Sequence, residues 1–175
     1  MPVHEYKGTR PRLGEGVFLA PTAHLAGAVE VGPDSSFWFQ TVARGDVNWI
    51  RIGARCSIQD GAVLHVTHET HPLVLADEVV VAHGAILHGC ALEDGCLIGI
   101  GARVLDGAVV ETGAQVGAGA VVPPGMRVPS GRLVLGVPAR VARELDEQER
   151  RAIPAIAKRY LGVKDAYLET LGRGF

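Results

Sequence analysis

The sequence lacks several features that would each point to a particular class of protein. Its charges nearly balance, at −2 over 175 residues, so there is no electrostatic case for a nucleic-acid or anionic membrane partner. No apolar run reaches the roughly 20 residues of a membrane span. The first residues, Met1 to Tyr6, hold no basic region followed by an apolar core, so we expect no signal peptide. The length favours a single domain over residues 1–175.

Cysteine is also scarce. The three cysteines, Cys56, Cys90 and Cys96, do not have the paired spacing of a metal motif. Cys56 and Cys96 fall at interior corner positions of the repeat described next, and Cys90 lies near one. We therefore expect buried, reduced thiols, which favour a cytoplasmic location.

What the chain does have is a six-residue repeat. A branched or large apolar residue recurs at every sixth position in four runs, which start at Leu19, Ile52, Leu75 and Leu92. A small residue follows four positions after almost every one. A period of six fits neither an α-helix nor the period-two strands of a β-sandwich. It is typical of a parallel β-helix, in which each hexapeptide forms one side of a three-sided coil.

Breaks in the repeat mark insertions. The step from Ala43 to Ile52 is nine residues, so about three residues should bulge out. The step from Leu64 to Leu75 is eleven, which predicts a loop of about five extra residues around 68–72. We expect the β-helix over about 13–138.

The last part of the chain has a different pattern. Asp146 followed by Glu149 resembles a helix start, and Ile156, Tyr160, Val163 and Tyr167 keep roughly helical spacing. Pro154 should kink or restart this helix. We predict a helical segment over about 144–172 that packs along the coil.

The six-residue period assigns each residue to one of the three sides of the coil, and it places three histidines on two adjacent sides. On one side, the residues just after the apolar positions are Arg44, His65 and His88, which should form one outward column. On the adjacent side, Asp60 and His83 should form a second column, with Gln59 beside Asp60. His4 and His24 have no partner in this register.

Three neutral imidazoles suit an open zinc site, with one position left for water, and iron or cobalt fits the same ligands. His65 and His88 can reach a common point, whereas His83 faces another direction. A threefold homotrimer resolves this, because His83 of one subunit can meet His65 and His88 of the next. We therefore predict three metal sites between subunits. The alternative interpretation is that these histidines are simply solvated surface residues.

Several motifs resemble one known family. They are the run 44–46 (Arg, Gly, Asp), the run 58–61 (Ile, Gln, Asp, Gly) followed by His65, and the run 81–90, which holds His83 and His88. Together they are similar to the signature of the γ-class carbonic anhydrases, over essentially the whole chain. The resemblance implies a mainly β fold, a left-handed parallel β-helix with a C-terminal α-helix, assembled as a trimer with metal between subunits.

The same resemblance assigns roles by matching position. It implies that His65, His83 and His88 bind the metal. Arg44, Asp46 and Asp60 would form ion pairs across the subunit boundary, Gln59 would hydrogen-bond the metal-bound hydroxide, and Tyr160 would line the pocket. A purely structural ion-pair network, and simple helix packing for Tyr160, are the alternative interpretations.

The implied reaction is reversible hydration of carbon dioxide to bicarbonate by the metal-bound hydroxide. The chain departs from the family's longer acidic loop, so His68, Glu69 or His71 would have to serve as the proton shuttle. Other interpretations remain open: a hexapeptide acyltransferase, a thioester hydrolase, or a metal-binding member without hydration activity.

Overall fold

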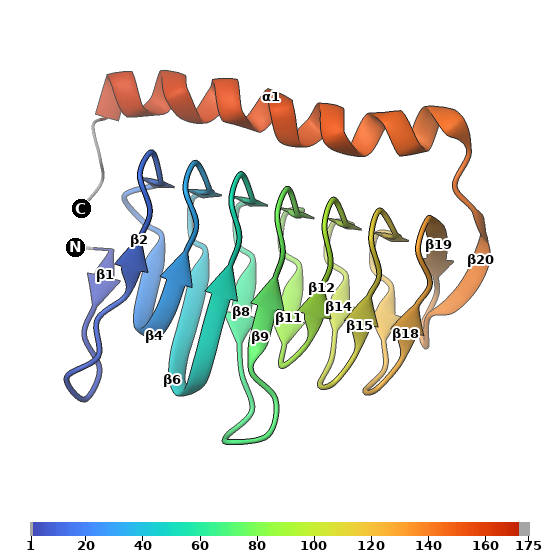
Figure 1. Cartoon of the computed structure of the whole chain (residues 1–175), viewed down its shortest axis with the longest axis horizontal. Helices are drawn as coiled ribbons and strands as arrows, with labels where there is room; N and C mark the ends of the chain where they lie inside the picture. The colour runs from blue at the N-terminus through green and yellow to red at the C-terminus, as the bar shows by residue number, and fades with distance from the viewer. Residues whose placement is uncertain (1, 172–175) are drawn as a thin grey trace.

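The computed structural model describes residues 2–171 and has a mainly β architecture (Figure 1). Its strands, in chain order, are β1 Val3–His4, β2 Arg12–Leu13, β3 Phe18–Leu19, β4 His24–Val31, β5 Ser36–Phe37, β6 Val42–Ile52, β7 Ser57–Ile58, β8 Val63–His65, β9 Leu73–Leu75, β10 Val80–Val81, β11 Ile86–His88, β12 Ala91–Leu92, β13 Leu97–Ile98, β14 Arg103–Val104, β15 Val109–Val110, β16 Gln115–Val116, β17 Val121–Val122, β18 Arg127–Val128, β19 Arg132–Leu135 and β20 Arg140–Glu144. One helix, α1, covers Glu147–Leu171.

The strands stack in parallel, coil upon coil, as the period of six predicts. On the first side the apolar residues pair in register from Leu25 through Ala43, Leu64 and Leu87 to Val104. A second side carries Val31, Ile52 and Leu75, and a third carries Phe37, Ile58 and Val81. This confirms the predicted parallel β-helix of hexapeptide repeats with a C-terminal helix. Pairing already begins at Val3, before the predicted start near residue 13.

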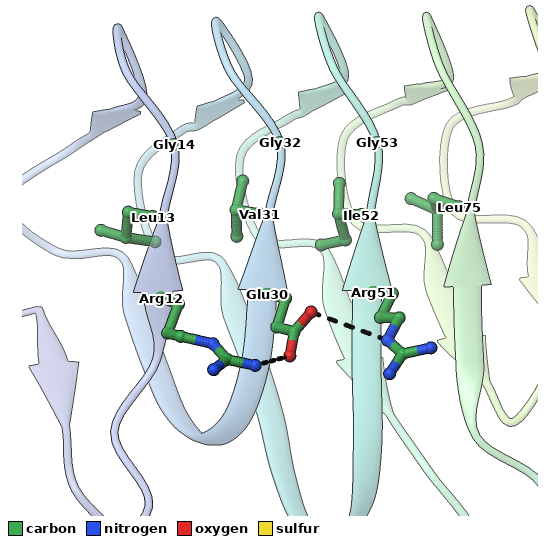
Figure 2. Close-up of a pocket in the computed structure, with 10 residues that line it drawn as sticks. All are labelled: Arg12, Leu13, Gly14, Glu30, Val31, Gly32, Arg51, Ile52, Gly53 and Leu75. Carbon is green, nitrogen blue, oxygen red and sulfur yellow. Dashed lines mark hydrogen bonds and ion pairs between the residues drawn. The ribbon is translucent and has the colours of Figure 1, made fainter.

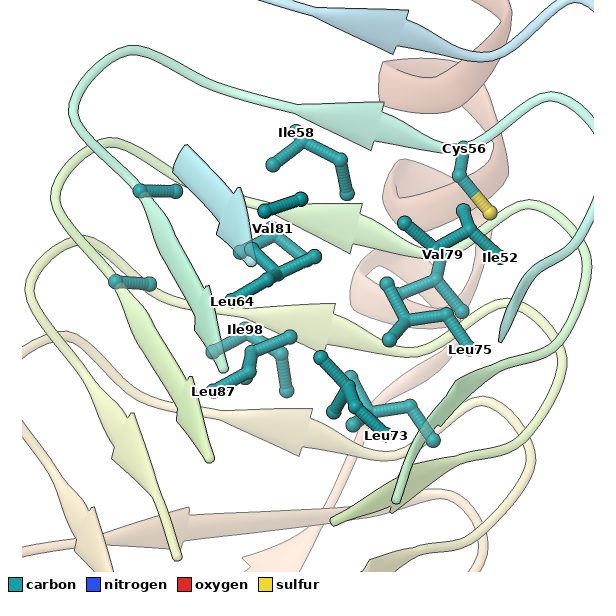
Figure 3. Packing of buried hydrophobic residues seen from close by; sticks show 14 of the residues in the cluster. Ile52, Cys56, Ile58, Leu64, Leu73, Leu75, Val79, Val81, Leu87 and Ile98 are labelled. Carbon is teal, nitrogen blue, oxygen red and sulfur yellow. The ribbon is translucent and has the colours of Figure 1, made fainter. Parts of the chain in front are cut away.

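The inside of the coil is filled by these same side chains. Ile58, Leu64, Leu87 and Ile98 have no exposed surface and contact one another inside the coil (Figure 3). Small residues occupy the corners, where the chain turns too sharply for a large side chain. Ala62, Ala85 and Ala102 lie there in successive coils and are fully buried. The hydrophobic interior therefore runs the length of the solenoid as one continuous cluster.

The cysteines follow the same plan. Cys56, Cys90 and Cys96 are free and buried, as predicted. Burial raises the pKa of the Cys56 and Cys96 thiols to about 12, and it raises that of Cys90 as well. These thiols are packing groups, not metal ligands.

Both predicted insertions are present. Opposite the single residue Ala28, strand β6 carries the four residues 46–49, so three extra residues bulge out of the ladder. The second insertion is the loop between β8 and β9, which projects beyond the coil (Figure 1). It is closed by an antiparallel bridge between Thr67 and His71. Both insertions emerge near the same corner region, next to His65.

The C-terminal helix starts with the predicted capping pair. The backbone N–H of Glu149 donates to Asp146 Oδ1 (2.8 Å), and the N–H of Asp146 donates to Glu149 Oε2 (3.0 Å). The expectation that Pro154 restarts the helix is wrong, since α1 is continuous from Glu147 to Leu171. Proline removes one intrahelical hydrogen bond, and burial of Ile153 and Ala157 on either side holds the helix in place.

Helix α1 runs back along the whole solenoid, so that its end lies beside the first coils (Figure 1). It packs on the third side, against β3, β5 and β10. Lys164 is only 2% exposed, and its Nζ donates to Gly16 O (3.1 Å) and Asp34 Oδ1 (3.2 Å). Among the described residues, no helix is long and apolar enough to cross a membrane.

Candidate metal centre

His65 and His88 lie side by side on the outer surface of neighbouring coils. They pair in register across β8 and β11, because both follow an inward-facing leucine. His65 Nδ1 and His88 Nε2 are 3.1 Å apart. Two nitrogen ligands of a tetrahedral zinc ion would be separated by roughly 3.3 Å, given bonds of about 2.0–2.1 Å. The spacing of the two rings therefore fits two ligands of one ion.

The other nitrogen of each ring lies within hydrogen-bond distance of a carboxylate. Asp46 Oδ1 lies 3.2 Å from His65 Nε2, and Asp106 Oδ1 lies 2.6 Å from His88 Nδ1. An ionised carboxylate can only accept, so each neutral ring carries its proton on the nitrogen that faces the carboxylate. The two nitrogens that face each other then both present lone pairs. That arrangement suits a cation placed between them.

The charges of the surrounding groups support this state. Burial raises the pKa of Asp46, but hydrogen bonds from Arg44 and His65 outweigh it and hold the pKa below its usual value. The pKa of Asp106 is lowered in the same way, since hydrogen bonds from His88 and Thr67 outweigh burial. Burial lowers the pKa of His65. Ionised carboxylates and a neutral imidazole are the forms that a metal centre requires.

The second predicted column lies on the adjacent side of the same chain. His83 Nδ1 and Asp60 Oδ2 are 2.9 Å apart, and their side chains are 47% and 46% exposed. Gln59, next to Asp60, is only 4% exposed. Tyr160 comes from α1 and packs edge-on against Trp38, with ring centroids 5.5 Å apart. Burial raises the pKa of Tyr160, and the negative charge of Asp60 adds to this.

The predicted site residues thus form two groups on one chain. His65 and His88 lie with Arg44 and Asp46, whereas His83 lies with Asp60, near Gln59 and Tyr160. Within the part of the chain that the structure describes, no cluster of three or more His, Cys, Asp or Glu is placed to hold a metal ion. Arg44 pairs with Asp46 of its own chain, and the predicted contact of Arg44 with Asp60 across a boundary stays a prediction.

The loop at 66–72 holds the three predicted shuttle groups. His68 and Glu69 are largely exposed, and His68 Nδ1 lies 3.9 Å from Glu69 Oε1. His71 is less exposed and lies against Gly107, where an added Cβ would come within 3.2 Å of its Nε2. His71 also lies close enough to Asp106, the carboxylate that contacts His88, to help lower the pKa of Asp106.

Sequence reasoning missed three residues of this region and one pair elsewhere. Asp106, Thr67 and Asn48 are joined to His88 by contacts described below, and none was predicted. An acidic residue one coil beyond His88, opposite a glycine, was the signal that could have identified Asp106. The prediction that His4 and His24 lack partners is wrong, because His4 Nε2 and His24 Nδ1 are 2.9 Å apart. The N-terminal strand β1, which the repeat did not reveal, brings His4 beside β4.

A separate groove of about 500 Å³ lies on the second side of the first coils. Figure 2 shows it between Arg12, Glu30 and Arg51, where Glu30 pairs with both arginines. Gly14, Gly32 and Gly53 also line it. None of the predicted site residues lines this groove.

Comparison with known proteins identifies the family. A Geobacillus kaustophilus protein named carbonic anhydrase is 43% identical over 159 residues, which is 91% of this chain and 87% of the relative. The Arabidopsis thaliana protein named gamma carbonic anhydrase 3, mitochondrial, is 49% identical over 162 residues, covering 90% of this chain and 63% of the relative. The chain belongs to the γ-class carbonic anhydrase family. Protein YrdA of Escherichia coli is also similar, at 38% identity over 170 residues, with 94% of this chain and 92% of YrdA covered. No family model matches.

Solved structures agree on the fold of this family member. A hexapeptide transferase family protein from Anaplasma phagocytophilum has a TM-score of 0.91 and 34% identity, covering 95% of this chain and 98% of its own. A Bacillus cereus protein assigned to the acetyltransferases has a TM-score of 0.94 and 39% identity, covering 96% of this chain and 97% of its own. The hexapeptide β-helix is therefore shared by proteins that carry different functional names.

Proposed function

We propose that this γ-class family member catalyses the reversible hydration of carbon dioxide to bicarbonate at metal centres between the subunits of a homotrimer. Each centre would use His65 and His88 of one subunit and His83 of another. The observation that carries this proposal is the division of the three imidazoles. The facing nitrogens of His65 and His88 are 3.1 Å apart, whereas His83 lies on the adjacent side beside Asp60. A second copy of the chain therefore has to supply the third imidazole.

The donor set fits zinc, and iron or cobalt is compatible with the same ligands. A bound zinc ion would lower the pKa of a coordinated water to about 7, which makes a nucleophile available at neutral pH. The protein's part is to hold the ligands and the reactants. Asp46 orients His65, and Asp60 orients His83.

The remaining residues would act on the reactants. The buried amide of Gln59 offers both a donor and an acceptor for orienting the attacking water. Arg44 keeps Asp46 ionised. Tyr160 would close the pocket from α1, with its ring held against Trp38. The proton that hydration releases would leave through the loop, where His68, Glu69 and His71 are the candidate carriers.

Stopped-flow hydration of carbon dioxide on zinc-loaded protein tests the proposal. We expect catalysis well above the uncatalysed rate for the natural chain and for His4→Gln, which changes a histidine outside the two groups. His88→Ala should fall to the uncatalysed rate, because it removes one of the three ligands and leaves only His65 and the His83 of the neighbouring subunit. Equal rates at the uncatalysed level for all three proteins would refute hydration activity and leave the fold and metal centre standing.

The transferase names of similar solved structures favour a second candidate, acyl transfer or thioester hydrolysis with a coenzyme A substrate. A screen of coenzyme A thioesters, followed by release of the free thiol, separates it from hydration. We expect no turnover by the natural chain. Turnover that His88→Ala abolishes, without hydration activity, would favour this candidate instead.

We also propose that the protein works in the cytoplasm. The support is that Cys56, Cys90 and Cys96 are free thiols.

A further inference from the structure

Asp106 lies one coil beyond His88 and reaches back to it. It follows β14 by two residues, and its Oδ1 lies 2.6 Å from His88 Nδ1. Gly89 makes this approach possible, because a Cβ at that position would lie 2.5 Å from Asp106 Oδ1. Gly89 also has a positive φ of 54°, which bends the chain directly after His88.

The other oxygen of Asp106 is held by the loop. Thr67 Oγ1 donates to Asp106 Oδ2 at 2.8 Å. Thr67 is itself fixed, because its N–H donates to His71 O (3.0 Å) and its carbonyl accepts from Asn48 Nδ2 (3.0 Å). Both insertions of the β-helix thus meet at Thr67, whose side chain holds Asp106.

We propose that Asp106 is a positioning residue of the metal centre: it keeps the proton of His88 on Nδ1, so that the Nε2 lone pair faces the cation, and Thr67 holds Asp106 in that orientation. This inference rests on the proposed metal centre. A neutral imidazole carries one proton, and the carboxylate can only accept, so their contact selects one tautomer. The loop between β8 and β9 therefore has a role at the metal centre, because its Thr67 orients His88 through Asp106.

The first test is zinc affinity, measured by competition with a chromophoric chelator. Asp106→Asn keeps the shape but can donate to Nδ1, which favours the wrong tautomer, and we expect about 10–100-fold weaker binding. Thr67→Val removes the hydroxyl at constant shape and should also weaken binding, whereas Thr67→Ser, which keeps the hydroxyl, should restore it. Asp94→Asn is the matched control, because Asp94 caps the backbone N–H of Asp77 (2.9 Å) in another corner and should leave zinc affinity unchanged.

The second test needs no metal. Nitrogen-15 imidazole spectra of the metal-free protein at pH 8.5 report which nitrogen of His88 carries the proton. We expect the Nδ1-protonated tautomer in the natural chain and a shift towards the Nε2-protonated tautomer in Asp106→Asn. An unchanged tautomer in Asp106→Asn overturns the inference, whatever the zinc affinities are. If the natural chain fails to bind zinc, the proposed function falls, and the tautomer result still decides the role of Asp106.

Discussion

At the scale of single residues, the candidate centre depends on where two imidazole protons lie. Asp46 contacts one ring nitrogen of His65, and Asp106 contacts one ring nitrogen of His88. The lone pairs of the other two nitrogens, His65 Nδ1 and His88 Nε2, then face each other across 3.1 Å. Without a cation, these lone pairs would repel. A cation bound between the two nitrogens, as proposed, would remove this repulsion.

Gly89→Ala tests how tightly this arrangement is packed. The new Cβ would clash with Asp106 Oδ1 at 2.5 Å and His71 Cβ at 2.7 Å, and the backbone φ of 54° disfavours a side chain. We expect a loss of about 1–3 kcal/mol in the free energy of unfolding and weaker zinc binding. Gly95→Ala is the control, because its φ is 63° but no atom lies within 4 Å of the added Cβ. Equal effects of the two substitutions on zinc affinity would contradict the packing argument.

The thiols provide a second prediction at this scale. Because burial raises the pKa of Cys56 and Cys96 to about 12, almost no thiolate is present at pH 8. We expect native protein to react negligibly with a disulfide reagent such as Ellman's reagent, and denatured protein to release three thiols per chain. Rapid reaction of a thiol in the native protein would show that the corner positions are accessible.

The histidines could be placed from the sequence because a strict period converts spacing into position. Leu64 and Leu87 fix the coil, so the residues that follow them must be neighbours. Asp106 could not be placed in the same way. Its contact with His88 depends on the absence of a side chain at Gly89 and on the path of a loop that no period describes.

At the scale of elements, the repeat determines the solenoid, and local signals determine the helix. The Asp146 and Glu149 pair marked the start of α1 correctly. The effect of Pro154 was misjudged, because the helix is held by packing on the solenoid, which sequence propensity does not include.

Lys164 is predicted to anchor the last turns of α1. Replacing it with methionine keeps the length of the side chain but leaves Gly16 O without its donor and Asp34 without its partner. We expect Lys164→Met to lower the free energy of unfolding by about 1–3 kcal/mol and to accelerate amide hydrogen exchange in the C-terminal half of α1. Lys158→Met, an exposed lysine on the same helix, should have little effect. Similar exchange in both variants would rule out the anchor.

The stability of the first turn of α1 should depend on pH. The guanidinium of Arg143 and the backbone N–H of Asp146 lower the pKa of Glu149 from its ordinary 4.5 to about 2. A lowered pKa means that this contribution to stability is fully present above pH 4.5 and is lost as the pH falls towards 2. Glu149→Ala should therefore destabilise the first turn at pH 6 and have a smaller effect at pH 3, as measured by exchange of the amides in that turn. An effect independent of pH would contradict this explanation.

At the scale of the whole molecule, one chain holds all the predicted ligands but does not bring them together. The sequence register predicted this division, because His83 falls on a different side from His65 and His88. How two copies meet could not be derived from one chain, since the period determines contacts within a solenoid and not between solenoids. The subunit arrangement is therefore the claim that most needs a direct test.

Mixing two defective chains gives that test. His83→Ala keeps an intact pair of His65 and His88, and His88→Ala keeps an intact His83. We expect neither protein alone to bind zinc tightly. In trimers refolded from an equal mixture, about one quarter of the interfaces join the two intact halves, so bound zinc should rise to about one quarter of the natural stoichiometry. Catalysis of carbon dioxide hydration should return in the same proportion. No recovery of zinc in mixed trimers of verified composition would contradict a centre shared between subunits.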